Sequence, residues 1–457
     1  MRPYSKNPHY WQYKGEPVLL IGGSVEDNLF QIPDLEEHLD LLASVGGNYV
    51  RCTMSSRDQG DAWPFERDMA SGLYDLTQPG REYWARFERF LKLADERDIV
   101  AQFELWDRFD FSREPWQDNP YNPKNNINYT AEESGLMTEI ATHPGLGENA
   151  FFRSAPALED NQLLLRYQNP QVDTMLSYSL KYGGVLYCID NETRESPEWG
   201  SYWASYVKSR AAEAGVEVQT TEMWDDRDLT APQHSATYDH PETYTFVDVS
   251  QNNHQSAESH WSGLQAVRRR IVESGEVRPI NSVKIYGAST GPYGSSRDGQ
   301  ERFWRNIMGG LASSRFHRPP SGLGLAEIAQ AHLRSMRMLT AEIDIFGCEP
   351  RNDLIGTRSW NAAYCLANAG VDYAVFFTDG GNVVLDMGAA PGGPVSLRWL
   401  DIRGCRWTGE AATTEPASKD EIYKIAPRPL LKGDGPFLRL VTPTEEGYWA
   451  AVVKIQA

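Results

Sequence analysis

The chain has few cysteines and no long apolar run, and each absence narrows the class of protein. Only five of its 457 residues are cysteines, widely spaced and without a CxxC pair. This pattern indicates neither a zinc site nor a disulfide framework, so we expect the thiols to stay reduced. No apolar run approaches the ~18 residues that signal a membrane span. We expect a cytoplasmic protein, or a periplasmic or secreted one if a leader has been removed, with no membrane partner.

Positive charge is also scarce, because 44 Lys and Arg face 63 Asp and Glu, which gives a formal net charge of -19. This balance argues against nucleic acid as a partner and favours a neutral or weakly charged ligand. The segment GGSVEDN, residues 22–28, lacks both the Rossmann glycine spacing and the P-loop lysine, so we expect no nucleotide cofactor. Two histidines, His254 and His317, show no recognised metal-ligand spacing, and we expect no metal. The oligomeric state is left open.

The length of the chain suits a (β/α)8 barrel of roughly 250 residues with an accessory domain. Apolar runs alternate with helical patterns, and eight such repeats predict an α/β fold with a closed parallel barrel of the TIM type. The predicted strands cover residues 16–23, 48–55, 99–105, 185–189, 216–226, 244–254, 278–287 and 313–319. The predicted helices cover residues 34–44, 82–97, 170–184, 203–215, 261–274, 299–309 and 325–346.

Two regions depart from this alternation. Residues 108–169 are rich in Pro, Asn and Gly, and a connection of this length in a compact barrel is typically a functional loop or a lid. Beyond residue 348 the pattern changes to short alternating runs separated by Gly, Pro and Asp turns, which is typical of an antiparallel β-sandwich. We therefore predict a barrel domain at 1–347 with an insertion at about 108–169, and a β-sandwich domain at 348–457.

The segment GGVLYCIDNETRESPEWGSYW, residues 183–203, contains the strongest candidate for chemistry. Its apolar run ends in Asp190, Asn191 and Glu192, and a polar loop follows. In a parallel barrel, side chains at the carboxyl ends of strands share one mouth, where active sites form. Glycoside hydrolysis needs two carboxyl groups around the scissile bond, one of them held protonated. We assign Glu192 as the acid, although a structural ion pair with Lys284 is the plain alternative.

Other strand ends supply the rest of the predicted site. Asn and His can hydrogen-bond sugar hydroxyls, and Trp can stack on a sugar ring, although Trp106 and Trp224 are equally well explained as core residues. The predicted catalytic residues are Glu192, Glu222 and Lys284. The predicted substrate-binding residues are Arg51, Glu104, Trp106, Asp107, Asn191, Trp224, Asp225, Asn252, Asn253, His254, Tyr286, Arg315 and His317.

The Asn191-Glu192 pair resembles the Asn-Glu of the large clan of retaining glycoside hydrolases with barrel folds, in which that Glu is the acid/base. Near the start, NPHYWQYKGEPVLLIGG, and near the end, GGNVVLDMG, VSLRWLDIRG and GYWAAVVKI, look like an apiosidase-like family. The resemblance spans most of the chain and is strongest at its two ends. It implies a barrel followed by a collagen-binding-like sandwich, and hydrolysis of a glycan without a cofactor.

The chain departs from that clan at the end of strand seven, where the clan has its nucleophilic Glu and this chain has Lys284. A lysine cannot form the glycosyl ester, so a second carboxylate must act or the chemistry differs. We favour Glu222, with Glu104 or Asp225 as alternatives. The competing functions are a sugar or uronate lyase or isomerase with Lys284, Tyr286 or His254 as base, and a carbohydrate-binding protein without catalysis.

Overall fold

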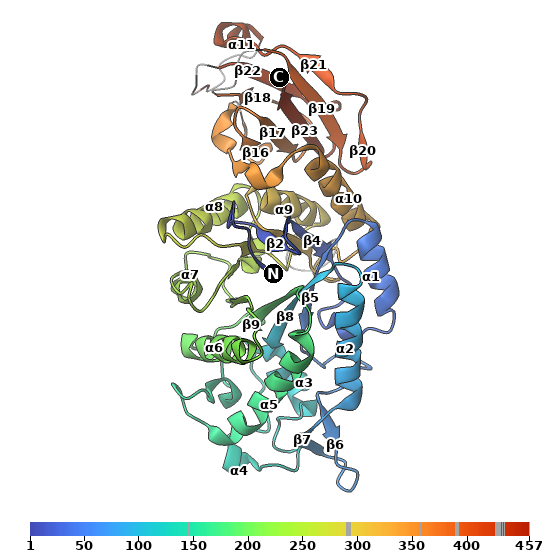
Figure 1. Ribbon diagram of the computed structural model, residues 1–457, viewed down its shortest axis with the longest axis vertical. Coiled ribbons are helices and arrows are strands. Elements are labelled where there is room, and N and C mark those ends of the chain that lie inside the picture. Colours follow the sequence, from blue (N-terminus) through green and yellow to red (C-terminus); the bar gives the residue numbers. More distant parts are fainter. Residues whose placement is uncertain are drawn as a thin grey trace.

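The computed structural model describes residues 1–144, 147–288, 294–356, 358–388, 393–425, 431, 433 and 435–456. Figure 1 shows an elongated molecule with the C-terminal strands at one end. The hairpin of β6 (Phe65–Arg67) and β7 (Tyr74–Pro79) lies at the opposite end, near α4 (Ala131–Ser134). No helix in the described part of the chain is long and apolar enough to cross a membrane.

Eight parallel strands lie within or close to the predicted stretches, and every residue in them is buried. They are β4 (Leu20–Gly23), β5 (Tyr49–Thr53), β8 (Val100–Trp106), β9 (Val185–Asp190), β10 (Thr220–Thr221), β11 (Val247–Asp248), β12 (Ile280–Asn281) and β13 (Ser313–Phe316). Burial on both faces explains why the longer ones read as continuous apolar runs. The strands β10, β11 and β12 are much shorter than predicted, with two residues each.

These strands form three separate ladders, with orders β5-β8-β9-β10, β11-β12 and β13-β4. Backbone hydrogen bonds connect the ladders to one another. They run from Phe246 N to Thr220 O (3.4 Å), from Ala312 N to Ile280 O (2.9 Å) and from Asn48 N to Ile21 O (2.9 Å). Neighbouring strands therefore follow the chain order, and the last strand, β13, pairs in parallel with the first, β4. All eight carboxyl ends point to one side, which we call the carboxyl-end face.

Helices separate most of these strands along the chain. They are α1 (Leu35–Ser44), α2 (Arg81–Asp95), α5 (Gln162–Ser179), α6 (Pro197–Glu213), α8 (Ala257–Glu273), α9 (Ser296–Met308) and α10 (Glu327–Glu342). The start of α5 differs from the prediction, because the helix begins eight residues before Pro170 and keeps that proline inside. The side chain of Asn161 caps it by accepting a hydrogen bond from Leu164 N at 3.2 Å. This cap sets the helix start, although proline removes one interior donor.

The predicted insertion at 108–169 is held by side chains in place of regular sheet. Asparagine amides donate to backbone carbonyls there, including Asn119 to Asp110 at 3.0 Å and Asn122 to Trp116 at 2.9 Å. Beneath them the rings of Phe111 and Phe151 pack with centroids 4.2 Å apart. The described part of the insertion is therefore a packed layer around α3 (Arg113–Asp118), which was not apparent from its composition.

The C-terminal region is rich in antiparallel strands. One sheet contains β14 (Glu349–Pro350), β16 (Ala363–Asn368), β17 (Asp372–Phe377), β23 (Trp449–Ile455), β19 (Val395–Asp401), β20 (Arg406–Trp407) and β21 (Ala412–Thr414), and the other β15 (Ile355–Gly356), β18 (Asn382–Asp386) and β22 (Phe437–Val441). Both sheets contribute to one apolar cluster, with Val375 from the first and Leu385 from the second. The other face of the larger sheet packs on α9, where Trp304 stacks on Phe376 at 5.2 Å.

Candidate active site

The end of β9 presents Asn191 and Glu192 on the carboxyl-end face. The backbone N–H of Asn191 donates to Trp106 O at 2.9 Å, which holds this segment to the neighbouring strand β8. Directly after it, Glu192 has a φ of 56°, in the left-handed region. An L-residue pays roughly 1–2 kcal/mol for this conformation. Such strain concentrates at functional positions and here turns the Glu192 side chain sharply out of the strand direction.

The Glu192 carboxylate is held by two groups that follow β12. One oxygen, Oε1, lies 2.6 Å from Lys284 Nζ and accepts a hydrogen bond from Tyr286 OH at 2.7 Å. Burial alone would raise the pKa of Glu192, but the Lys284 ammonium and these hydrogen bonds outweigh it and hold the pKa well below its usual range. The side chain of Lys284 is only 2% exposed. In the free protein Glu192 is therefore ionised and paired.

A second chain of contacts orients the amide of Asn191. Its Nδ2 donates to Asp107 Oδ1 at 2.9 Å, and its Oδ1 accepts a hydrogen bond from Lys284 Nζ. The other oxygen of Asp107 pairs with Arg57 Nη1 at 2.5 Å. The ordering of these donors and acceptors fixes the amide in one orientation. Sequence analysis missed Arg57, which lies in the loop four residues beyond the end of β5.

Two histidines lie beside this cluster. The ring of His254 is 4.7 Å from that of Tyr286, and the ring of His317 is 5.1 Å from it on a different edge. Burial lowers the pKa of His254, although the Glu192 charge works in the opposite direction. Burial likewise lowers the pKa of His317 well below its usual value. Both rings are therefore neutral near pH 7 and suited to hydrogen bonding.

The structure does not bring Glu222 to Glu192, and the prediction that it is the second catalytic carboxylate does not fit this placement. Its Oε1 accepts from the backbone N–H groups of Asp190 at 2.9 Å and Met223 at 3.0 Å. Its Oε2 faces α6 so closely that a Cβ added at Gly200 would lie 2.5 Å away. The residue is 1% exposed, and burial raises the pKa of Glu222 well above its usual value. Glu222 is therefore a protonated group in the core.

The pair Arg51 and Glu104 is buried beneath the cluster. Two nitrogens of Arg51 lie 2.5 Å from the two oxygens of Glu104, and both side chains are fully buried. Arg51 also pairs with Asp27, an additional acid that sequence analysis did not select. Because the guanidinium and carboxylate satisfy each other, these groups support the site from below and do not reach a substrate.

Five other predicted binding residues belong to the packed interior. Trp106 packs on Trp203 with ring centroids 5.1 Å apart, and Trp224 donates its indole N–H to Thr237 Oγ1 at 2.8 Å. The remaining three are buried and use their side chains on backbone or neighbouring polar groups: Asn252 with His260 O (2.9 Å), Asn253 with Ser282 Oγ (2.8 Å) and Arg315 with Val283 O (2.6 Å). Burial removes them from contact with a ligand.

Asp225 is the most exposed of the predicted carboxylates, with 22% of its side chain accessible. Its backbone N–H donates at 2.9 Å to Thr193 O, the residue next to Glu192. Its carboxylate accepts from Arg108 at 2.8 Å and from Arg194 at 2.9 Å. Asp225 therefore lies on the carboxyl-end face one strand away from Glu192. Within the described residues, no group of three or more His, Cys, Asp or Glu could hold a metal ion.

Comparison with known proteins supports a fold relationship. No protein-family model and no curated protein matches the chain. A glycoside hydrolase family 5 structure from Bacteroides vulgatus ATCC 8482 is 11% identical, with a TM-score of 0.60, over 99% of this chain and 93% of that one. Another structure, described as a glycoside hydrolase, is 9% identical, with a TM-score of 0.65, over 99% and 96% of the two chains. At these identities the likeness establishes the fold alone.

Proposed function

We propose that the protein is a glycoside hydrolase that cleaves a glycosidic bond in a plant or microbial glycan fragment. In this proposal the eight parallel strands form a (β/α)8 barrel, and the C-terminal sheets form a β-sandwich domain from about residue 348. Support for the barrel comes from the chain-order pairing of the strands and the return of β13 to β4. The active site lies on the carboxyl-end face, as in other barrels of this kind.

The observation that carries the proposal is the position of Glu192. It follows a buried strand in a strained backbone conformation, and its carboxylate meets Lys284 and Tyr286 from another strand end. A carboxylate held in this way can transfer a proton at the scissile bond once substrate enters between these groups. Glu192 is thus the proposed acid/base residue, with Lys284 and Tyr286 as the groups that set its proton affinity.

Asp225 is the proposed second carboxylate. It shares the carboxyl-end face with Glu192, it is accessible, and Arg108 and Arg194 hold its orientation. Hydrolysis of this type requires either a base for water or a nucleophile opposite the acid. Asp225 meets the requirement for an accessible carboxylate, which Glu222 does not.

The test is release of reducing sugar from a panel of plant and microbial oligosaccharides. Glu192→Gln should lower kcat roughly 10²- to 10⁴-fold, the usual contribution of general acid or base catalysis. Glu222→Gln is the matched control, because glutamine resembles the protonated carboxyl of a buried residue, and it should retain activity. Full activity of Glu192→Gln would contradict the proposal. Proton NMR of the first product anomer then separates retention from inversion.

A carbohydrate-binding protein without catalysis is the second candidate. The observation in its favour is the Lys284–Glu192 ion pair at 2.6 Å, which neutralises the carboxylate that should react. In that case the same oligosaccharides would bind, as measured by titration calorimetry, but no product would form with the unmodified protein. Loss of binding in Tyr286→Phe with no turnover in either protein would support this alternative.

A further inference from the structure

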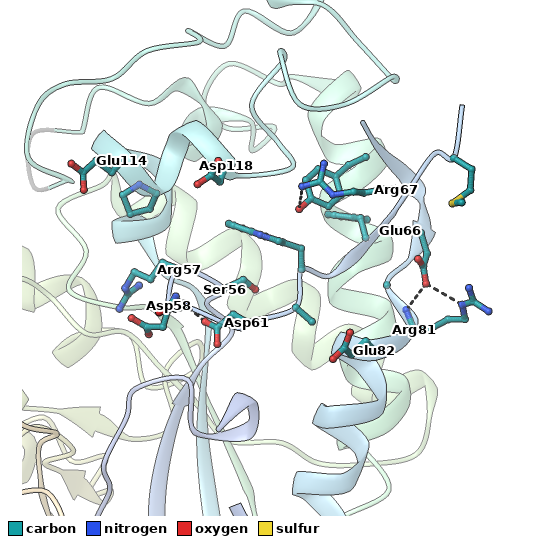
Figure 2. Close-up of a pocket in the computed structure, with 18 residues that line it drawn as sticks. Ser56, Arg57, Asp58, Asp61, Glu66, Arg67, Arg81, Glu82, Glu114 and Asp118 are labelled. Carbon is teal, nitrogen blue, oxygen red and sulfur yellow. Dashed lines mark hydrogen bonds and ion pairs between the residues drawn. The ribbon is translucent and has the colours of Figure 1, made fainter. Parts of the chain in front are cut away.

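A large cavity lies outside the cluster around Glu192. Its volume is about 860 Å³, and its walls come from the loop after β5, the β6–β7 hairpin, the start of α2 and the helix α3. Figure 2 shows Glu114 and Asp118 of α3 on one side and Glu66 and Arg81 on the other. Cavities of roughly 300–1,000 Å³ are typical of small-molecule sites. The space is therefore large enough for at least one sugar unit.

The aromatic floor of this cavity is held rigidly. Trp63 is half-buried and packs edge-to-face on Tyr74, with ring centroids 6.4 Å apart. The residue before Trp63, Ala62, is clamped by the Gln31 amide through two hydrogen bonds of 2.9 and 3.0 Å. A side chain at Gly80 would collide with Trp63 O, so the backbone also packs closely here. A preorganised ring loses little entropy when a ligand stacks on it.

The charge of the cavity is acidic. The described residues that line it include three arginines and six carboxylates, namely Asp58, Asp61, Glu66, Glu82, Glu114 and Asp118. All three arginines are engaged: Arg57 with Asp107 and Asp110, Arg67 with Tyr74, and Arg81 with Glu66. Carboxylates accept hydrogen bonds from hydroxyl groups and repel an anionic ligand. The lining thus suits a neutral, hydroxyl-rich molecule.

Arg57 connects the cavity to the cluster. It lines the cavity and pairs with Asp107, which holds the amide of Asn191, the residue directly before Glu192. Three consecutive contacts therefore join the two sites. A chain molecule with its reacting bond at Glu192 can extend past Arg57 toward Trp63.

We propose that this cavity binds the continuation of a neutral oligosaccharide whose reacting bond lies at Glu192, with Trp63 as the stacking platform. The inference rests on the proposed function, because it places the reacting bond at Glu192. It makes the protein selective for glycan length and against uronate or sulfate groups at this end. The specificity follows from the acidic lining and the aromatic floor together.

The experiment compares Trp63→Ala with Trp360→Ala, a matched control because Trp360 is 72% exposed in the C-terminal region. The probes are neutral disaccharides and hexasaccharides of one linkage, and a uronate hexasaccharide. Trp63→Ala should reduce the ratio of kcat/KM for the long over the short neutral glycan about tenfold or more, mainly through KM, since aromatic anchors often supply this much binding. Trp360→Ala should leave the ratio unchanged, and the Tm of each variant checks folding.

Calorimetry with the Glu192→Gln background separates this inference from the proposed function. If no probe is turned over but the hexasaccharide binds in a Trp63-dependent manner, the cavity assignment stands and the hydrolase proposal fails. If turnover occurs and Trp63→Ala leaves the long-to-short ratio unchanged, the cavity assignment fails. A second variant, Glu114→Lys, should admit the uronate hexasaccharide at least severalfold better, and an unchanged preference would also overturn the assignment.

Discussion

Replacement of Lys284 by methionine tests how the charge of Glu192 is set. Lys284 Nζ lies 2.6 Å from Glu192 Oε1, and the lysine side chain is 2% exposed. An opposite charge at this distance typically lowers a carboxyl pKa by roughly 1–3 units. Each unit corresponds to about 1.4 kcal/mol, so the Lys284 charge is worth roughly 1.4–4 kcal/mol to the ionised form. Without it, burial prevails and raises the pKa of Glu192 above its usual value.

The sign of the pH dependence follows from linkage. In the unmodified protein Glu192 has a depressed pKa, so its stabilising contribution is present above the unfolded pKa and is lost as pH falls through the folded pKa. In Lys284→Met the carboxylate is buried without a partner at high pH, which typically costs about 3–5 kcal/mol. We expect the variant to lose about 3 kcal/mol at pH 8 and at least about 1 kcal/mol less at pH 5, where Glu192 can take up a proton.

Urea unfolding at the two pH values measures the effect. The control is Lys284→Met combined with Glu192→Gln, which removes both charges and should recover most of the stability lost at pH 8. If activity is present, the acidic limb of the pH–rate profile should move upward in Lys284→Met by the same number of pKa units. An equal loss of stability at both pH values, with no recovery in the double variant, would refute the reasoning.

Three further outcomes follow from the geometry. Asp248→Asn should become more stable relative to the unmodified protein as pH rises from about 4 to 8, by up to roughly 4 kcal/mol in urea unfolding, because burial raises the pKa of Asp248 to about 7 and that charging cost disappears. Gly200→Ala should cost roughly 1–3 kcal/mol, since its Cβ would lie 2.5 Å from Glu222 Oε2, and an unchanged Tm would contradict that placement. Glu192→Gly should be about 1 kcal/mol more stable than Glu192→Ala, because φ is 56° there; the reverse order would show that the backbone relaxes.

The sequence located β9 within a residue and predicted the Glu192–Lys284 ion pair as the plain alternative to catalysis. A fully buried parallel strand is a continuous apolar run, so its end can be read from where polar residues begin. The structure confirms that the side chains of Glu192, Lys284 and Tyr286 meet. Strand ends converge in any parallel sheet of this kind, which is why residues nearly a hundred positions apart could be placed together.

The orientation of Glu222 could not be predicted in the same way. The strand before it, β10, has only two residues, Thr220 and Thr221, whereas the apolar pattern suggested eleven. Side chains alternate between faces only while the strand geometry continues. Beyond Thr221 the chain instead turns Glu222 back onto the N–H groups of Asp190 and Met223. Such local hydrogen bonding leaves no periodic signal in the sequence.

The Lys284–Glu192 pair also constrains how catalysis could begin. A general acid must hold a proton before it can donate one, and the Lys284 ammonium keeps Glu192 ionised in the free protein. Substrate must therefore weaken this pair, either by accepting the Lys284 hydrogen bond with a sugar hydroxyl or by excluding water so that the proton affinity of Glu192 rises. Otherwise Glu192 can act only as a base, and the proton for the leaving group must come from another side chain. The pH–rate profile distinguishes the two cases, because a required protonated Glu192 imposes loss of activity on the alkaline side, whereas a required ionised Glu192 imposes it on the acidic side.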